Sequence, residues 1–329
     1  MRIVFAGTPT VAVPTLRALV AGPHEVVGVV TRPDAPLGRK RVLTPSPVAE
    51  AAEELHVPVV KAARLDEDAT ASILELEPDL GVVVAYGGLV REPLLSAPAH
   101  GWINLHFSLL PRWRGAAPVQ RAVIAGDQQT GAAVFRLVPQ LDAGDVYDTL
   151  VRPIGTDETA GDVLESLSCV GAELVARVVD RIADGTAETA PQHGEPTLAP
   201  KLTIDDAALD LTQDARAVYA RLRGVTPEPG AFFGVGGVRV KVLRASRSGA
   251  EQLEPGELAL AGGRAFVGTG SSPLELVTVQ PAGKRPMPGA DWLRGLTPGV
   301  RADVPGPAAG PGPGPATSPE SASRGEEHA

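Results

Sequence analysis

An amide and an imidazole stand two residues apart in the segment NLHFSLLPRWRG, which begins at Asn104. They follow a short apolar run, so Asn104 and His106 fall at the end of a predicted strand, where alternation gives both side chains the same face. Further along the chain, Asp142 precedes an Ala-Gly turn that fixes a carboxylate at the end of a loop. An amide, an imidazole and a carboxylate together suit proton transfer and stabilisation of an oxyanion.

The residue types alone leave two interpretations of this trio open. In the simpler one, Asn104 and His106 satisfy each other's hydrogen bonds at a strand end, and Asp142 is an ordinary turn residue. In the catalytic one, Asn104 and His106 donate to a tetrahedral intermediate, while Asp142 raises the pKa of His106 and helps to move a proton from an attacking amine. No Ser, Cys or Lys stands as an obvious covalent nucleophile, so direct group transfer is the simpler chemistry.

The elements that must position these residues have the pattern of an α/β fold. Nearly continuous apolar runs at 2–7, 25–31 and 81–87 are typical of buried parallel strands, and residues 103–106 form the next one. Helical patterns separate them, which predicts a doubly wound, mostly parallel, Rossmann-like sheet whose ligands bind beyond the carboxyl ends of its strands. A long amphipathic helix is expected from about Thr159. Its predicted buried face carries Val163, Leu167, Val170, Leu174 and Val178.

Several functional classes are excluded by the sequence. The turn from Ala6 to Pro9 follows the first strand but is not GxGxxG, and Pro9 lacks the amide that would donate to a phosphate, which argues against dinucleotide binding. The single cysteine, Cys169, cannot form an internal disulfide and is expected to be a small buried residue. No signal segment or apolar run of transmembrane length is present, so a soluble, cytoplasmic protein is expected.

Changes in composition along the chain predict two domains and a tail. Residues 1–188 form the first domain, and the Pro- and Gly-containing residues 189–203 form a linker. Residues 204–300 carry short strands separated by glycines, which predicts a small antiparallel barrel or sheet. Residues 301–329 are rich in Pro, Gly and Ser and are expected to be disordered.

Basic residues are distributed unevenly between these parts. Residues 1–199 carry 16 Lys and Arg against 25 Asp and Glu, whereas residues 200–300 carry 12 against 10, a contrast that ordinary surface variation can also produce. In the second part, Arg239 and Lys241 alternate with valines, which gives the predicted sheet a basic outer face. The triplet Arg39-Lys40-Arg41 stands in a loop of the acidic first part, either as a solvated surface or as a contact for a polyanion.

Longer motifs in the sequence resemble a known family. The segment NLHFSLLPRWRGAAPVQRAVIAGD, followed by TGAAVFRL and LDAGDV, resembles the formyltransferases that use 10-formyltetrahydrofolate, with their N-x-H and SLLP motifs and a later aspartate. The segments MRIVFAGTPTVAVPTLRAL, TRPDAPLGRKRVLTPSP, APKLTIDDAALD and VQPAGKRPMPGADWLRG also follow the pattern of members that act on charged initiator tRNA. The resemblance therefore runs from Met1 to about Leu296.

The resemblance implies a reaction, substrates and site residues. It implies transfer of the formyl group of 10-formyltetrahydrofolate to the α-amino group of methionine on initiator tRNA, without a metal, by a monomer. It assigns catalysis to Asn104, His106 and Asp142, and an OB-like fold with a tRNA-binding basic face to the second domain. The loop that would hold the folate is Ser108, Leu109, Leu110 and Pro111. The candidate tRNA contacts are Arg39, Lys40, Arg41, Lys201, Arg239, Lys241, Lys284 and Arg285.

Two alternatives and two departures accompany this resemblance. Sister formyltransferases act on small amines such as glycinamide ribonucleotide, but the second domain and the basic loop argue against that group. A catalytically inactive tRNA-binding protein would lack the polar trio, which this chain has. The chain departs from the family pattern at Gly87-Gly88 and at 224–230, and neither place touches the proposed chemistry.

Overall fold

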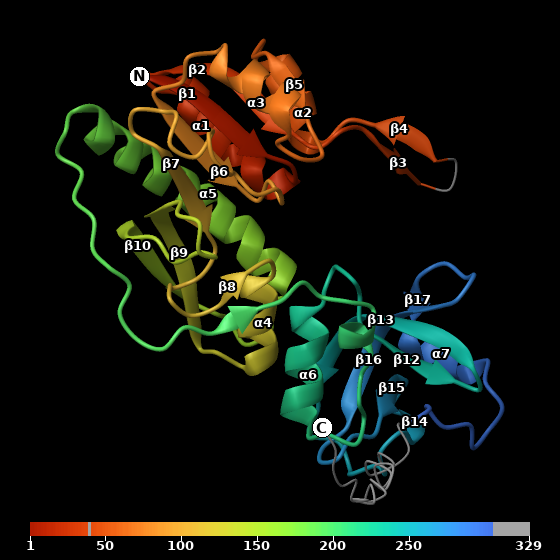
Figure 1. Cartoon of the computed structure of the whole chain (residues 1–329). Coiled ribbons are helices and arrows are strands. Elements are labelled where there is room, and N and C mark those ends of the chain that lie inside the picture. The colour runs from red at the N-terminus through yellow and green to blue at the C-terminus, as the bar shows by residue number, and fades with distance from the viewer. Residues whose placement is uncertain (39–40, 305–329) are drawn as a thin grey trace, which may run out of the picture.

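The computed structural model describes residues 1–38 and 41–304, which form two domains joined by a long segment (Figure 1). The sheet of the first domain is built from seven strands: β1 (Arg2–Gly7), β2 (Glu25–Thr31), β5 (Val59–Lys61), β6 (Leu80–Val84), β7 (Trp102–His106), β9 (Gln129–Arg136) and β10 (Val146–Pro153). Their order is β10-β9-β7-β6-β1-β2-β5. The five strands from β7 to β5 are parallel, whereas β9 runs antiparallel to β7, and β10 antiparallel to β9.

Helices cover both faces of this sheet, as expected for a doubly wound fold. They are the short η1 (Thr10–Ala12), α1 (Val13–Ala21), α2 (Pro47–Glu54), α3 (Glu67–Leu74), α4 (Pro118–Ala125) and α5 (Ala160–Ala183). Local sequence explains where several begin. Ser46 caps α2 ahead of Pro47, and Thr159 opens α5 with a reciprocal pair of hydrogen bonds to Asp162. The mostly parallel α/β prediction is confirmed.

The alternation along β7 separates the core from the site. Ile103 and Leu105 pack into the core that α1 and α5 cover, which leaves Asn104 and His106 on the opposite face of the strand. One helical position was predicted wrongly: Val170 of α5 is 41% exposed, and Gly171 faces the sheet instead. A Cβ atom at Gly171 would lie 2.9 Å from Leu105 Cδ2, so the buried stripe passes through a residue without a side chain.

The single cysteine was also predicted wrongly. Cys169 is exposed, not buried, because it lies beside Val170 on the solvent-facing side of α5. The buried stripe of this helix instead runs through Leu167, Gly171 and Leu174, at spacings of three and four residues. The helical period thus rotates position 169 away from the sheet.

The segment between the two domains lies along the first domain. Ala190 forms an antiparallel bridge with Val146 at the start of β10. Further on, β11 (Leu198–Ala199) pairs in parallel with β8 (Arg114–Gly115), in the loop that follows β7. The predicted linker is therefore bound to the first domain at several points.

The second domain is an antiparallel half-barrel with helices against it. Its strands are β12 (Phe232–Val235), β13 (Val238–Arg247), β14 (Leu258–Ala261), β15 (Arg264–Val267), β16 (Leu274–Pro281) and β17 (Met287–Pro288), and its helices are η2 (Asp205–Ala207), α6 (Ala215–Gly224) and α7 (Gly289–Arg294). The strand order is β12-β13-β16-β15-β14, and β17 pairs with β16. Val240 and Val242 of β13 are buried in the core while Arg239 and Lys241 are exposed, as the alternation predicted, but Val238 is exposed as well.

Helices α4 and α6 pack against each other between the domains, and Tyr219 and Arg223 of α6 also donate hydrogen bonds to residues just before α5. A Cβ atom at Gly224 of α6 would lie 2.4 Å from Ile124 Cγ1 of α4, so the two helices approach closely at this glycine. Arg121 of α4 also forms an ion pair with Asp206 at 2.8 Å. The two domains therefore pack directly against each other.

A two-stranded hairpin projects from the first domain, away from its sheet (Figure 1). It consists of β3 (Ala35–Leu37) and β4 (Val42–Thr44), and Leu37, Val42 and Leu43 are exposed. Arg39 and Lys40, two predicted tRNA contacts, lie outside the described residues. No helix in the described part of the chain is long and apolar enough to cross a membrane.

The start of the predicted tail belongs to the second domain, which corrects the expectation of disorder from residue 301. Ala302 is 3% exposed and forms a bridge with Val235, and Arg301 forms one with Glu257. The amide of Ala302 donates to the Gly256 carbonyl at 2.8 Å. Composition did not reveal this pairing, because Arg301 and Ala302 form isolated bridges with the half-barrel and do not belong to one of its strands. Residues 305–329 lie outside the described residues.

Shortening the chain tests this edge pairing. A chain that ends at Val300 loses the backbone hydrogen bonds of residues 301–303 and the burial of Ala302, so we expect a free energy of unfolding lower by about 1–3 kcal/mol. The matched reference is a chain that ends at Val304. Thermal unfolding of both proteins measures the difference, and equal Tm values would contradict a stabilising role for residues 301–303.

Candidate active site

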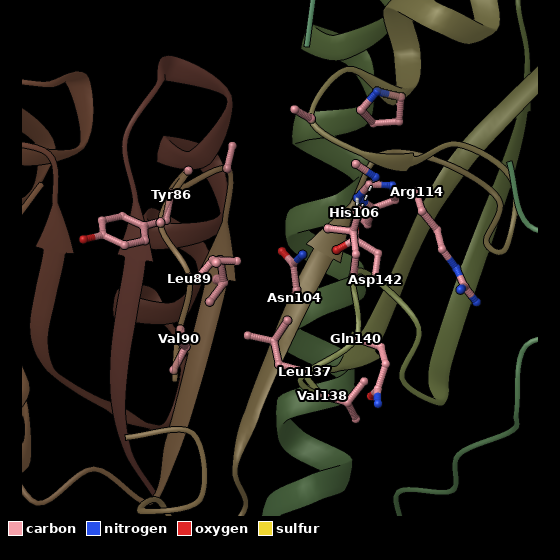
Figure 2. Close-up of a pocket in the computed structure, with 18 of the residues that line it drawn as sticks. Tyr86, Leu89, Val90, Asn104, His106, Arg114, Leu137, Val138, Gln140 and Asp142 are labelled. Carbon is pink, nitrogen blue, oxygen red and sulfur yellow. Dashed lines mark hydrogen bonds and ion pairs between the residues drawn. The ribbon is translucent and has the colours of Figure 1, made fainter. Parts of the chain in front are cut away.

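A cavity of about 990 Å³ opens at the carboxyl ends of β6 and β7, where the topology of an open parallel sheet places ligand sites (Figure 2). Asn104 and His106 lie on its wall together with Asp142 from the loop after β9. The trio predicted from the sequence is thus brought together from segments almost 40 residues apart. The remaining wall comes from residues 85–92, 114–116, 137–141 and 198–200.

His106 is buried and has one ring nitrogen occupied. Its Nε2 atom lies 2.8 Å from the carbonyl oxygen of Trp113, so Nε2 carries a proton and donates it to that carbonyl. The Nδ1 atom lies 3.8 Å from Oδ2 of Asp142. In the neutral imidazole, Nδ1 therefore presents a lone pair on the side of the carboxylate.

Burial decides the charge of this imidazole. Desolvation lowers the pKa of His106 below its ordinary value, while the attraction of Asp142 and the hydrogen bond to Trp113 act in the opposite direction. The sequence predicted the direction of the Asp142 contribution, but the larger effect is burial. His106 is consequently neutral at physiological pH and able to accept a proton at Nδ1.

Asp142 is held by a strained turn and by one backbone donor. It has a positive φ of 45°, and its Oδ2 atom accepts a 2.7 Å hydrogen bond from the amide of Gly115. Two residues later, a Cβ atom at Gly144 would lie 1.8 Å from the Arg136 carbonyl oxygen, so only glycine fits there. The sequence Asp-Ala-Gly thus allows the loop to fold back and aim the carboxylate at His106.

The Asn104 side chain does not form the hydrogen bond with His106 that the simpler interpretation predicted. Its Oδ1 atom is buried without a hydrogen bond from any described residue. Figure 2 shows the amide nitrogen on the side of His106 and Asp142. Because buried polar atoms are normally satisfied, an orphaned amide beside a cavity points to a bound molecule, and the interpretation as a mutually satisfied pair does not describe this structure.

The loop after β7 reaches the cavity wall through residues 114–116. Ser108, Leu109, Leu110 and Pro111 are not among the residues that line the cavity. Ser108 is fully buried and donates to the carbonyl of Arg112 at 2.6 Å, which closes the loop. The side chains of this loop are thus used to shape the chain that carries Trp113.

Apolar residues that the sequence analysis did not single out form the cavity wall. Leu89 and Val90 follow β6, while Leu137 and Leu141 belong to the loop that carries Asp142. Leu89 and Leu141 are exposed, as expected for side chains at the mouth of a ligand site. The signal in the sequence was Gly87-Gly88, which ends the apolar run of β6 and turns the chain toward the cavity.

The predicted basic residues lie at three places. Arg239, Lys241, Lys284 and Arg285 are exposed at one end of the half-barrel, where the Ala282 amide donates to the Arg239 carbonyl at 2.9 Å. Arg41 is exposed at the hairpin, and Lys201 is exposed at the end of the linker. Across residues 1–38 and 41–304, no cluster of three or more His, Cys, Asp or Glu side chains is arranged to hold a metal ion.

Known proteins share this fold and this sequence. The formyl transferase family matches residues 1–179, and the C-terminal domain of formyl transferases matches residues 201–297. An N-formyltransferase from Helicobacter canadensis, solved with folinic acid and dTDP-3-aminofucose, has the same fold with a TM-score of 0.63 at 15% identity, covering 83% of this chain and 98% of that one. HypX from Aquifex aeolicus, solved with tetrahydrofolic acid, has a TM-score of 0.60 at 19% identity, covering 92% of this chain and 49% of that one.

Relatives of known name are much more similar in sequence. The methionyl-tRNA formyltransferase of Leifsonia xyli subsp. xyli is 63% identical over 90% of this chain and 97% of its own length. That of Clavibacter sepedonicus is 61% identical over 90% of this chain and 98% of its own length. With both family domains matched in order and this identity over nearly the whole of each relative, the chain belongs to the formyl transferase family and, within it, to the methionyl-tRNA formyltransferases.

Proposed function

We propose that the chain transfers the formyl group of 10-formyltetrahydrofolate to the α-amino group of methionyl initiator tRNA. The observation that carries this proposal is the convergence on one cavity of three polar groups: His106, whose Nδ1 atom lies 3.8 Å from Oδ2 of Asp142, and Asn104, whose buried Oδ1 atom has no hydrogen bond from a described residue. The names of the relatives at 61% and 63% identity supply the substrate class. The monomeric state and the cytoplasmic location that the sequence suggested stay predictions.

The trio can balance the protons of this reaction. The amine nitrogen bonds to the formyl carbon while the bond from that carbon to the folate nitrogen breaks, so one nitrogen must lose a proton and the other must gain one. Nδ1 of His106 accepts the first proton, and the Asp142 carboxylate stabilises the imidazolium that results. His106 then gives the proton to the departing folate nitrogen, so its protonation state is restored.

Asn104 is proposed to stabilise the negative charge on the formyl oxygen. That oxygen gains charge as the amine adds, and an amide N–H aimed at it lowers the barrier when water is excluded. The orientation of Asn104 supports this role, because its amide nitrogen lies on the side of His106 and Asp142 (Figure 2).

The cavity suits a flat, partly apolar donor. Its volume of about 990 Å³ is that of a site for a molecule of drug size or larger, and its wall carries Leu89, Val90, Leu137 and Leu141. The folate is therefore assigned to this wall. Residues 108–111, which the family resemblance assigns to the folate, are proposed to contribute through backbone groups of the same loop.

The acceptor is proposed to reach the site from the side of the basic residues. Arg239, Lys241, Lys284 and Arg285 offer phosphate contacts at one end of the half-barrel, and Lys201 lies on the chain between that domain and the cavity. Arg41, with the sequence neighbours Arg39 and Lys40, gives the hairpin a second basic contact. A formyltransferase for a small amine needs neither surface, which favours the tRNA acceptor.

Substitution of the trio tests the chemistry. We expect His106→Ala and Asp142→Ala each to lower formyl transfer to methionyl initiator tRNA by about 10²-fold or more, because each removes a group that moves or stabilises a proton. Asn104→Ala should lower kcat more than it raises the KM for the folate. Transfer assays of the wild type and the three variants, with glycinamide ribonucleotide as an alternative acceptor, measure these effects. Near-normal turnover of the variants, or a preference for the small amine, would overturn the proposal.

Removal of single basic side chains tests the acceptor surface. For Lys241→Ala and Arg41→Ala we expect a lower kcat/KM for the tRNA and a salt dependence shallower by about one unit in the logarithmic slope, because each loses one phosphate contact. Folate affinity, measured by titration, should stay unchanged. The exposed Arg64 of the first domain, replaced by Ala, is the matched control. Equal kinetics in all three variants would remove these surfaces from tRNA recognition.

A further inference from the structure

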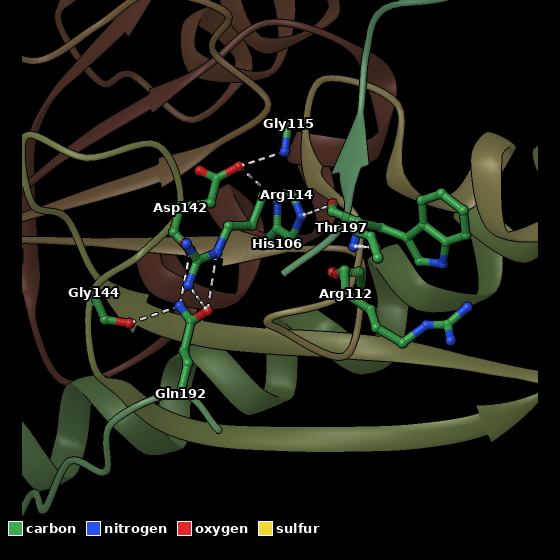
Figure 3. A network of polar contacts seen from close by, with 10 residues as sticks. His106, Arg112, Arg114, Gly115, Asp142, Gly144, Gln192 and Thr197 are labelled. Atoms are coloured by element: carbon green, nitrogen blue, oxygen red, sulfur yellow. Dashed lines mark hydrogen bonds and ion pairs between the residues drawn. The ribbon is translucent and has the colours of Figure 1, made fainter. Parts of the chain in front are cut away.

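The segment between the domains contacts both loops that carry the catalytic groups. Between Ala190, which bridges to β10, and β11, which pairs with β8, two polar side chains turn toward the site. These are Gln192 and Thr197, and Figure 3 shows them in one network with His106 and Asp142. Neither residue is among those that line the cavity.

Gln192 ties down the Asp142 loop through its side-chain amide. Its Nε2 atom donates to the carbonyls of Asp142 at 2.8 Å and of Gly144 at 2.9 Å. Its Oε1 atom accepts from the guanidinium of Arg114 at 2.6 and 3.2 Å. These contacts allow only one orientation of the Gln192 amide. In the flipped orientation, its oxygen would face the two carbonyl oxygens and its NH₂ group would face the Arg114 guanidinium, so no hydrogen bond could form.

Thr197 holds the peptide that orients His106. Its Oγ1 atom accepts a 2.9 Å hydrogen bond from the amide of Trp113, whose φ of 63° is unusual for a bulky residue. The Trp113 carbonyl is the acceptor for Nε2 of His106. Asp127 accepts from Trp113 Nε1 at 2.8 Å and fixes the side chain of the same residue. Thr197 thus holds the backbone of Trp113, and Asp127 holds its indole ring.

We propose that Gln192 and Thr197 are positioning residues for formyl transfer, the first for the Asp142 carboxylate and the second for the Nε2-protonated tautomer of His106. The inference deepens the proposed function and rests on it. Gln192 donates to the carbonyl of Asp142, and Thr197 accepts from the amide of Trp113; both of these residues have a positive φ, a conformation that persists only where its surroundings hold it. The chain that carries the second domain therefore also sets the geometry of the first domain's catalytic groups.

Variants of Gln192 test the first half of the proposal. Gln192→Glu keeps an acceptor for Arg114 but loses both donors to the loop carbonyls, and Gln192→Ala loses all three contacts. We expect both to lower kcat about 10-fold to 10²-fold with the KM of each substrate within about threefold of the wild type, because misplacement of a catalytic group costs turnover more than binding. Glu195→Gln, an exposed change in the same segment, is the control.

Variants of Thr197 test the second half without reference to substrates. Thr197→Val keeps the shape but removes the acceptor for the Trp113 amide, whereas Thr197→Ser keeps the hydroxyl. The ¹⁵N chemical shifts of labelled His106 report which ring nitrogen carries the proton. We expect the wild type and Thr197→Ser to hold the proton on Nε2, and Thr197→Val to populate the other tautomer and lose kcat.

The outcomes separate this inference from the proposed function. A Gln192→Glu protein with wild-type kcat, or a Thr197→Val protein with the wild-type His106 tautomer, would overturn the positioning role. Loss of activity that Thr197→Ser fails to restore would do the same. If the wild type transfers no formyl group, the proposed function fails, and the His106 tautomer in Thr197→Val still decides whether the linker orients the imidazole.

Discussion

The hydrogen bond from His106 Nε2 to the Trp113 carbonyl is the interaction on which the site depends. It fixes which ring nitrogen faces Asp142, and therefore which atom can accept a proton. The imidazole is held from one side by β7 and by the Phe135 ring, which lies almost perpendicular to it with the centroids 6.3 Å apart. The carbonyl is held from the other side by a loop that Ser108 closes. The hydrogen bond between His106 and Trp113 thus connects the sheet to the loop that follows β7.

Both catalytic loops are kept in backbone conformations that a free chain would leave. Trp113 and Asp142 have positive φ, at a cost of about 1–3 kcal/mol each, and such conformations persist only where the surroundings over-determine them. Here the surroundings include the segment between the domains, which donates to one loop and accepts from the other. The catalytic groups of the first domain are consequently held in place partly by Gln192 and Thr197, which follow its last helix, α5.

The sequence predicted those features that follow from local periodicity. Alternation placed Asn104 and His106 on one face of β7, and apolar runs indicated the parallel sheet with its ligand site at the carboxyl ends. Features set by long-range packing were missed. Gln192 lies 50 residues from Asp142 in a Pro- and Gly-containing stretch typical of a passive linker, so no local pattern indicated its contacts. The SLLP loop was assigned to the folate from the family resemblance, and its closure around the buried Ser108 is visible only in three dimensions.

The most direct test of the account is a pH titration of the His106 side chain by ¹⁵N NMR in the wild type and in Asp142→Asn. The account predicts a neutral, Nε2-protonated ring at pH 7 with a pKa below the ordinary value of about 6.5, since burial outweighs the attraction of Asp142. Loss of that attraction should lower the pKa of His106 further, so protonation should begin at lower pH in the variant. An imidazolium at pH 7, or a higher pKa in Asp142→Asn, would contradict it.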